Sequence, residues 1–409
     1  MTKQSLSLNK PSRQLLRHIL RHDNSKIWYD SKLLNLLQLY FFTGILANWG
    51  GLVFVNNVIL LVCIISVFFF KKGRTISFLS PLTFAYGLLT LLSIVNHIRW
   101  LDDAGMPANA RTMLFVFMAM IAFRQLAIPG FFERAINVNA LPFALLIPLG
   151  HHGIGGRYYS YFLNENILGS ALPFAYAVGL CSFAERRYEW KSMVALFASL
   201  AIMVLGARRS LLLYCIPSTL IVLVSIKKIS LRDVCIVVIL FLFFWGVVVP
   251  NMNSRLAERF GSNFSLVNHF NDIFYGVTDD KSASVRSEFI DISIKSANHD
   301  LLGYGNGNFR YIVEQFGGSN VPVAGHPHSG LAESMITGGY IGLVLYLFML
   351  FYLIKIGYND TVIRICMIWM FLGIFVETNL NNRIIWPLLA IAEKELTCTR
   401  KDSKEHVRK

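Results

Sequence analysis

The sequence predicts an all-α polytopic membrane protein with about 12 transmembrane helices and one long periplasmic loop that carries short helices. Hydrophobic residues make up 55% of the 409 residues and charged residues only 15%, whereas soluble domains carry about 25% charged residues. Apolar runs of about 17–20 residues recur along the chain, which is the length that a bilayer core requires. Residues 1–30 are polar and basic, so we expect no cleavable signal peptide.

Hydropathy predicts twelve spans, the last of them short and interrupted by Pro387. The expected spans are 33–48, 51–70, 77–96, 110–127, 135–150, 167–184, 191–207, 210–226, 234–250, 338–356, 361–378 and 383–393. They divide the chain into a basic cytoplasmic tail (1–32), helices one to nine (33–250), a long periplasmic loop (251–329), helices ten to twelve (330–393) and a second cytoplasmic tail (394–409).

The distribution of Lys and Arg predicts the orientation of these spans. With the N-terminus in the cytoplasm, the inner segments hold 26 Lys and Arg residues and the outer segments 12, of which six lie in the long loop. Because short cytoplasmic loops are enriched in Lys and Arg, both termini are expected inside and the long loop outside. The same bias accounts for the net charge of +14, so nucleic-acid binding is not expected.

The long loop has room for a water-exposed substructure. It holds six basic and eight acidic residues, so any anion that binds there must be held by particular arginines. A helix of about 14 residues, with Ser282 or Ser284 as its cap and Arg286 near its start, is predicted by residues at helical spacing: Val285, Phe289, Ile292 and Ser296. The Gly-x-Gly-x-Gly segment at 303–307 then breaks regular structure and leads back towards the next span.

A His-Pro-His turn stands where this loop meets the tenth span. His328 is not needed for the fold of a lipid-facing helix, and a side chain that titrates near neutral pH at the water boundary can act as a general base. His326 flanks the same proline, and Glu333 about one turn later can orient the imidazole. A purely structural histidine is the alternative interpretation.

Three further arginines are candidates for substrate binding. Arg208 and Arg209 lie between two apolar spans on the outer side, where their planar guanidinium groups suit two-point binding of phosphate oxygens. Snorkelling to lipid headgroups is the alternative. Arg286 can bind the same ligand or be an ordinary solvated helix residue.

An aromatic stretch at 156–166 precedes the sixth span and contains Arg157. Tyrosines with Arg and Asn at a membrane boundary suit sugar stacking, and they equally suit an interfacial aromatic belt.

Cysteine placement predicts no disulfide, because all six cysteines fall in spans or on the cytoplasmic side. They are Cys63, Cys181, Cys215, Cys235, Cys366 and Cys398. No Cys/His cluster has metal-ligand spacing, so neither a metal nor another cofactor is expected.

The order of these motifs resembles the O-antigen ligase and O-antigen polymerase superfamily of bacterial envelope enzymes. The resemblance covers roughly residues 150–350. It comprises the Arg-aromatic helix entry, the Arg-Arg-Ser hairpin, the long loop with Gly-x-Gly-x-Gly-Asn-Phe, and His-Ser-Gly-Leu-x-Glu before a Gly-Tyr-Ile-Gly helix. The family usually has Asn after this His, whereas Ser329 stands here.

The resemblance implies a GT-C-like glycosyltransferase of lipopolysaccharide or polysaccharide biosynthesis in the bacterial inner membrane. It would transfer a whole glycan from undecaprenyl diphosphate to a glycan or lipid A–core acceptor, among membrane lipids, by a metal-independent inverting route at the periplasmic face. Arg208 (or Arg209) and Arg286 would hold the diphosphate, and His328 would take the proton from the acceptor hydroxyl.

Several alternatives stay open. A polymerase, which the variants around His328 slightly favour, and a ligase need the same donor and base. A metal-dependent transfer through Asp102-Asp103 is a second route. A lipid-linked glycan transporter is disfavoured because few ionisable residues fall inside the spans, and a non-catalytic membrane scaffold is the last alternative.

Overall fold

The computed structural model describes residues 35–43 apart from 37 and 42, 52–70, 80–100, 106–126, 130–146, 151–152, 158–159, 165–185, 189–205, 209–226, 281–317, 329–376 and 380–408. The predicted span 33–48 is therefore described in part, as helix around Tyr40, and the predicted span 234–250 lies outside the described residues.

In the described part of residues 52–226, seven helices coincide with predicted spans. They are α3 (Leu52–Phe70), α4 (Pro81–Arg99), α5 (Met106–Leu126), α6 (Phe131–Leu146), α7 (Glu165–Ala184), α8 (Trp190–Leu205) and α9 (Arg209–Ile226). Between α6 and α7, the two-residue strands β1 (His151–His152) and β2 (Tyr158–Tyr159) pair antiparallel. Each helix ends within four residues of its predicted span, because apolar length is the signal that sets these helices.

The C-terminal part departs further from the prediction. Its helices are α13 (Lys281–His299), α14 (Phe309–Phe316), α15 (Gly330–Gly357), α16 (Thr361–Val376) and α17 (Ile385–Arg408). α15 begins well before the predicted residue 338, and α17 continues through the predicted tail. Pro387 does not interrupt α17, because it lies in the first turn, where a proline breaks no helical hydrogen bond.

Apolar surface agrees with the predicted membrane class. By length and composition, α4 and α15 are the two described helices that could cross a membrane, although two such helices alone give weak support. Along the bundle, Phe54, Leu91 and Val344 are 72%, 55% and 64% exposed, which suits contact with lipid tails. The architecture is helical as predicted, and the number of twelve spans stays a prediction.

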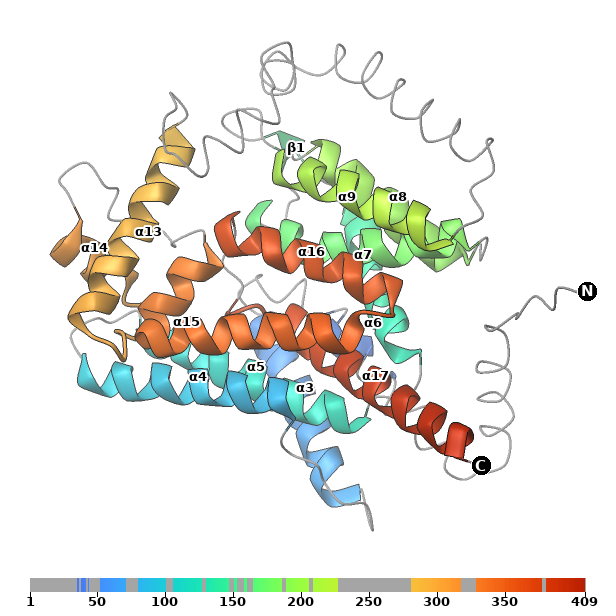
Figure 1. Cartoon of the computed structure of the whole chain (residues 1–409), viewed down its shortest axis with the longest axis horizontal. Helices are drawn as coiled ribbons and strands as arrows, with labels where there is room; N and C mark the ends of the chain where they lie inside the picture. Colours follow the sequence, from blue (N-terminus) through green and yellow to red (C-terminus); the bar gives the residue numbers. More distant parts are fainter. Residues whose placement is uncertain are drawn as a thin grey trace, which may run out of the picture.

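Figure 1 shows α15 lying beside α4, with α13 and α14 gathered at one end of the bundle and the C-terminal end of α17 at the other. The main core is aromatic, with Tyr86, Tyr214, Trp369 and Trp386 fully buried. Helix α4 starts at a defined place because Ser80 and Thr83 form a reciprocal capping box and Pro81 occupies the first turn.

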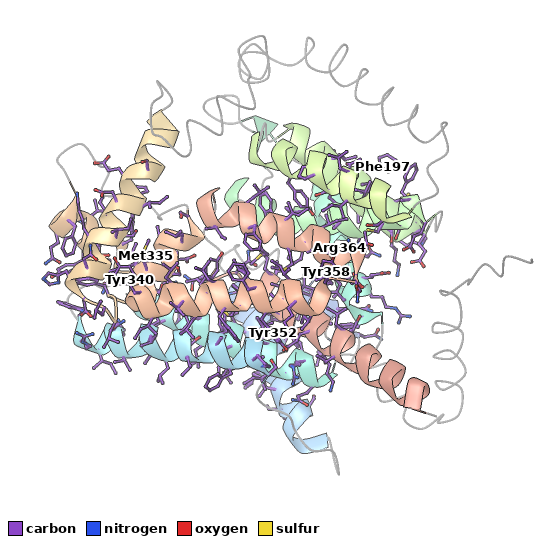
Figure 2. The ribbon with its side chains drawn as sticks, in the orientation of Figure 1. Phe197, Met335, Tyr340, Tyr352, Tyr358 and Arg364 are labelled. Atoms are coloured by element: carbon purple, nitrogen blue, oxygen red, sulfur yellow. The ribbon has the colours of Figure 1, made fainter. Side chains whose placement is uncertain are left out.

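Helix α15 is broken near its start. Gly338 (φ −139°, ψ 21°) and Gly339 (φ 60°, ψ −148°) leave the helical region, and the second conformation is open essentially to glycine alone. Met335 and Tyr340 lie on the two sides of this break, close to α13 and α14 (Figure 2). The break separates a short first half of α15 (330–337) from the long second half, and it marks the end of the bundle where the predicted site falls.

Candidate functional site

Helix α15 begins at Ser329, which directly follows the predicted base His328. The Ser329 hydroxyl accepts a hydrogen bond from the backbone N–H of Ala332 (3.2 Å) and donates one to the carbonyl of Ile374 on α16 (2.7 Å). This buried side chain therefore caps the helix and ties its start to a neighbour. Serine and asparagine both cap helices well, so the departure from the usual family residue preserves the cap.

The glycine segment at 303–307 runs against three helices. Gly303, Gly305 and Gly307 all have positive φ, at 79°, 88° and 105°. A β-carbon on Gly303 would overlap the backbone at the break in α15, one on Gly305 would lie 3.1 Å from a carbonyl of α4, and one on Gly307 would lie 2.7 Å from the Asn109 amide of α5. The glycines thus let the loop fold directly onto α15, α4 and α5.

Glu333 joins this loop to the turn before α17. One carboxylate oxygen accepts a hydrogen bond from the backbone N–H of Leu380 (3.0 Å), and the other accepts one from the side-chain amide of Asn306 (3.4 Å). The Asn306 oxygen accepts a further bond from the Asn381 amide (2.9 Å). Since Glu333 is only 6% exposed, these bonds provide the compensation that a buried carboxylate needs.

Side chains of helix α4 form hydrogen bonds with the same loop and with α15. The amide of Asn96 donates to the carbonyls of Leu302 (2.5 Å) and Thr337 (3.1 Å), and the hydroxyl of Ser93 accepts from the backbone N–H of Asn306 (3.1 Å). Both α4 side chains are buried. Polar residues inside a membrane helix are costly unless they have such partners, so their presence in α4 is explained by the loop.

Helices α13 and α14 cover this assembly with a second hydrophobic cluster, formed by Phe289, Ile292, Tyr304, Phe309, Ile312, Val313 and Ile336. The predicted helix is confirmed as α13, and three of the residues whose spacing predicted it, Phe289, Ile292 and Ser296, are buried. Burial, with a smaller effect of Asp300, raises the pKa of Tyr304 to about 12, so its hydroxyl stays protonated beside His299 Nδ1 at 2.7 Å.

Three ion pairs between described residues lie at this end of the bundle, and one of them, Lys295–Asp291 (2.7 Å), is within α13. Arg99 contacts Asp300 at 2.7 Å, which links the end of α4 to the start of the glycine segment. Arg310 pairs with Glu314 one turn along α14 at 3.0 Å, and both side chains are more than half exposed. The Arg310–Glu314 pair contributes little to stability, since exposed pairs are worth at most about 1 kcal/mol.

Most of the predicted site residues fall where positions are not described. Arg157, Arg208, His326 and His328 lie outside the described residues. Arg209 is the first residue of α9 and Arg286 lies on α13, but neither side chain is described. The diphosphate clamp and the predicted contact between Glu333 and His328 therefore stay predictions.

Sequence reasoning missed the polar residues that bind Glu333. Ser93 and Asn96 break an otherwise apolar stretch, and Asn379, Asn381 and Asn382 cluster just before the last span. Polar residues inside an apolar span were the available signal. That signal does not reveal the partner, because Ser93, Asn96 and Asn381 bond to segments far away in the chain.

The opposite end of the bundle holds buried charges of its own. Glu393 accepts hydrogen bonds from Arg124 (3.2 Å) and from the hydroxyl of Tyr352 (2.8 Å), and Figure 2 places Tyr352 away from the broken end of α15. Glu395 accepts from the backbone N–H of Phe132 (2.9 Å) at the start of α6. Burial raises the pKa of Glu395 to about 7, against the lowering effect of these backbone bonds.

Among the described residues, no group of three or more His, Cys, Asp or Glu side chains could hold a metal ion. Asp102 and Asp103, the alternative metal ligands, lie outside that part of the chain. The cysteines whose side chains are described, Cys63, Cys181, Cys215 and Cys366, are free thiols.

A helical bundle with exposed apolar faces suits a membrane protein, and a polar loop folds onto a broken helix at one end of it. Residues 193–347 match the family described as O-antigen ligase. The match confirms the predicted resemblance to the O-antigen ligase and polymerase superfamily over these residues. No curated protein matches the chain.

The matched range includes Arg208, Arg209, Arg286, His328 and Glu333, and the glycine segment with them. The match supports membrane glycosyltransferase activity of the ligase and polymerase type, with a lipid-linked glycan and an acceptor as substrates, in O-antigen or related polysaccharide biosynthesis.

Proposed function

We propose that the protein is a repeat-unit polymerase, which moves a glycan en bloc from undecaprenyl diphosphate to an acceptor hydroxyl at the periplasmic face of the bacterial inner membrane. The observation that carries the proposal is the start of α15 inside the family-matched range. The Ser329 cap and the Glu333 hydrogen bonds fix this helix start on two sides. A residue that directly precedes such an anchored start is well positioned for catalysis.

The proposed reaction needs one base and a set of cations. His328 takes the proton from the acceptor hydroxyl as its oxygen attacks the anomeric carbon, and the bond from that carbon to the diphosphate oxygen breaks. Attack from the face opposite the leaving group inverts the anomeric configuration. Arg208 (or Arg209) and Arg286 stabilise the charge on the released undecaprenyl diphosphate without a metal. Arg157 and His326 are proposed as further substrate contacts.

A ligase is the second candidate, and the family description itself favours it. A ligase would use the same donor and the same base and would differ in the acceptor, lipid A–core in place of a second lipid-linked repeat unit. Genes for a flippase and a chain-length regulator beside this one would favour the polymerase, whereas genes for core oligosaccharide would favour the ligase.

One feature of the structure favours the alternative function, transport of lipid-linked glycans. Discontinuous helices and buried ionisable residues are common in transporters, and α15 is broken while Glu333 and Glu393 are buried. The small number of ionisable residues inside the predicted spans is therefore only a weak argument against transport. A transporter, however, would form no glycosidic bond.

The direct test is transfer by the purified protein in nanodiscs, with an undecaprenyl-diphosphate-linked repeat unit as the sole substrate. We expect chains longer than one unit, unchanged by EDTA, and a new linkage of inverted anomeric configuration by NMR. A requirement for lipid A–core would make the protein a ligase. Loss of activity in EDTA would support the metal-dependent route. No transfer to either acceptor would overturn the enzymatic proposal.

A further inference from the structure

Arg383 occupies a constrained place in the turn between α16 and α17. Its guanidinium Nη1 donates a hydrogen bond to the side-chain oxygen of Asn57 near the start of α3 (2.8 Å), and its backbone carbonyl accepts one from the hydroxyl of Tyr40 (3.0 Å). The side chain is partly buried. Both ends of the residue are thus held by other helices. No other residue in the described part of the chain accepts a hydrogen bond from the guanidinium, so the rest of its fork can bind a ligand.

A second arginine approaches the first. Arg111 lies in the second turn of α5 and is exposed. Helix α5 packs along α17, where Arg124 contacts Glu393 at 3.2 Å, and this packing brings the positive charge of Arg111 near that of Arg383 just before α17. Within the described part of the chain, neither arginine pairs with a carboxylate, whereas Arg99 and Arg124 both do. Two neighbouring cations are unfavourable together, and an anion bound between them would remove that penalty.

The same turn also supports the start of α15. Leu380 and Asn381 hold Glu333 and Asn306, and Arg383 follows two residues later. The Arg111–Arg383 pair is therefore connected, through one short turn, to the helix start that directly follows His328. By contrast, two arginines expected to bind the donor, Arg209 and Arg286, belong to α9 and α13.

We propose that Arg111 and Arg383 bind the diphosphate of the lipid that carries the acceptor glycan. The inference rests on the proposed function, in which two lipid-linked substrates meet and each brings its own diphosphate. Inversion places the acceptor and the leaving group on opposite faces of the reacting sugar, so the protein needs separate anion sites. The pair tied to the helix start after His328 suits the acceptor, since that base deprotonates the acceptor hydroxyl.

The decisive variant is Asn57→Asp, which is close to isosteric. It places a carboxylate against Arg383 and so competes with any bound phosphate, while the new ion pair keeps the turn in place. Arg111→Gln and Arg383→Gln remove the charges directly. Arg310→Gln is the matched control, because Arg310 is an exposed arginine at the same end of the bundle that already has a carboxylate partner, Glu314.

Two measurements test the proposal. Native mass spectrometry counts undecaprenyl diphosphate bound to the protein in phosphatidylcholine nanodiscs, and a second arm replaces it with phosphatidylglycerol. Transfer assays in which the donor and the acceptor concentrations are varied separately give the half-saturating concentration of each substrate. We expect Asn57→Asp, Arg111→Gln and Arg383→Gln to lose one of two bound diphosphates and to raise the half-saturating acceptor concentration about tenfold or more. The half-saturating donor concentration should stay unchanged, and Arg310→Gln should behave as wild type.

Three outcomes would overturn the inference, and a fourth would count against the proposed function alone. If the variants lost bound phosphatidylglycerol but kept both bound diphosphates, the arginine pair would be a lipid-headgroup site, and the inference would be wrong. A rise in the half-saturating donor concentration alone, or normal binding in Asn57→Asp, would overturn it as well. Wild-type protein that binds two diphosphates but transfers nothing would instead refute the proposed function and leave the anion site standing.

Discussion

The carboxylate of Glu333 accepts a hydrogen bond from the backbone N–H of Leu380 at 3.0 Å, across the space between α15 and the turn before α17. This bond joins two segments that the chain separates by 47 residues. It connects the helix start that follows His328 to the turn that carries Arg383, so the proposed base and the proposed anion site share one support.

Replacing Glu333 should reveal how much this support contributes. Glu333→Ala leaves the Leu380 N–H and the Asn306 amide without their acceptor, which costs about 1–3 kcal/mol for a buried group. Glu333→Gln keeps one acceptor oxygen and should lose less. Thermal unfolding in detergent measures both variants. Equal stability of wild type and Glu333→Ala would show that the network does not hold the site together.

Gly339 tests the contact between the break and the loop. Gly339→Ala must adopt φ 60° and would also overlap the carbonyl of Leu301. Gly130 is the matched control, because it has φ 77° with no atom within 4 Å of the added β-carbon. We expect Gly130→Ala to cost about 1–2 kcal/mol from backbone strain alone and Gly339→Ala to cost clearly more, with loss of transfer. Similar unfolding temperatures for the two variants would argue against close packing at the break.

The arginine clamp distinguishes geometry from charge. Lysine keeps the charge of Arg208 and Arg286 but loses the planar two-point contact, so each Arg→Lys change should weaken transfer by about 1–3 kcal/mol. Arg310→Lys is the control and should be near neutral, since Arg310 is exposed and pairs with Glu314. Polysaccharide laddering in a complemented deletion strain is the assay. Full activity in both clamp variants would favour simple snorkelling to lipid headgroups.

The raised pKa of Glu395 predicts that the stability of the protein depends on pH. This residue lies in the part of α17 that extends beyond the predicted span. Its pKa is about 7 in the folded protein against an ordinary value of 4.5, so the folded state holds the proton more tightly than the unfolded state. The resulting stability is fully present below the unfolded pKa and is lost as the pH rises through about 7.

Glu395→Gln stays neutral at every pH and can still accept the bond from Phe132. We expect this variant to unfold at a higher temperature than wild type at about pH 8 and at a similar temperature at about pH 5. Parallel curves for the two proteins across this range would show that Glu395 is not the titrating group.

Helix positions were predictable because apolar length is a local signal, and the helices from α3 to α9 coincide with the expected spans. The early start of α15 was not predictable, since Glu333 and Thr337 make residues 330–337 too polar to read as a span. Their burial depends on Asn306 and Asn96, and no hydropathy pattern encodes such partners. The glycine segment was recognised as irregular, but its contacts with three helices depend on the tertiary fold.

The central claim is that His328 is the base, and His326 is its natural control because it flanks the same proline. The measurement is glycan transfer by His328→Ala and by His326→Ala, each at membrane abundance matched to wild type. We predict that His328→Ala abolishes transfer while its abundance stays normal, and that His326→Ala keeps most of the activity. Normal transfer by His328→Ala, or a reversal of the two effects, would contradict the assignment.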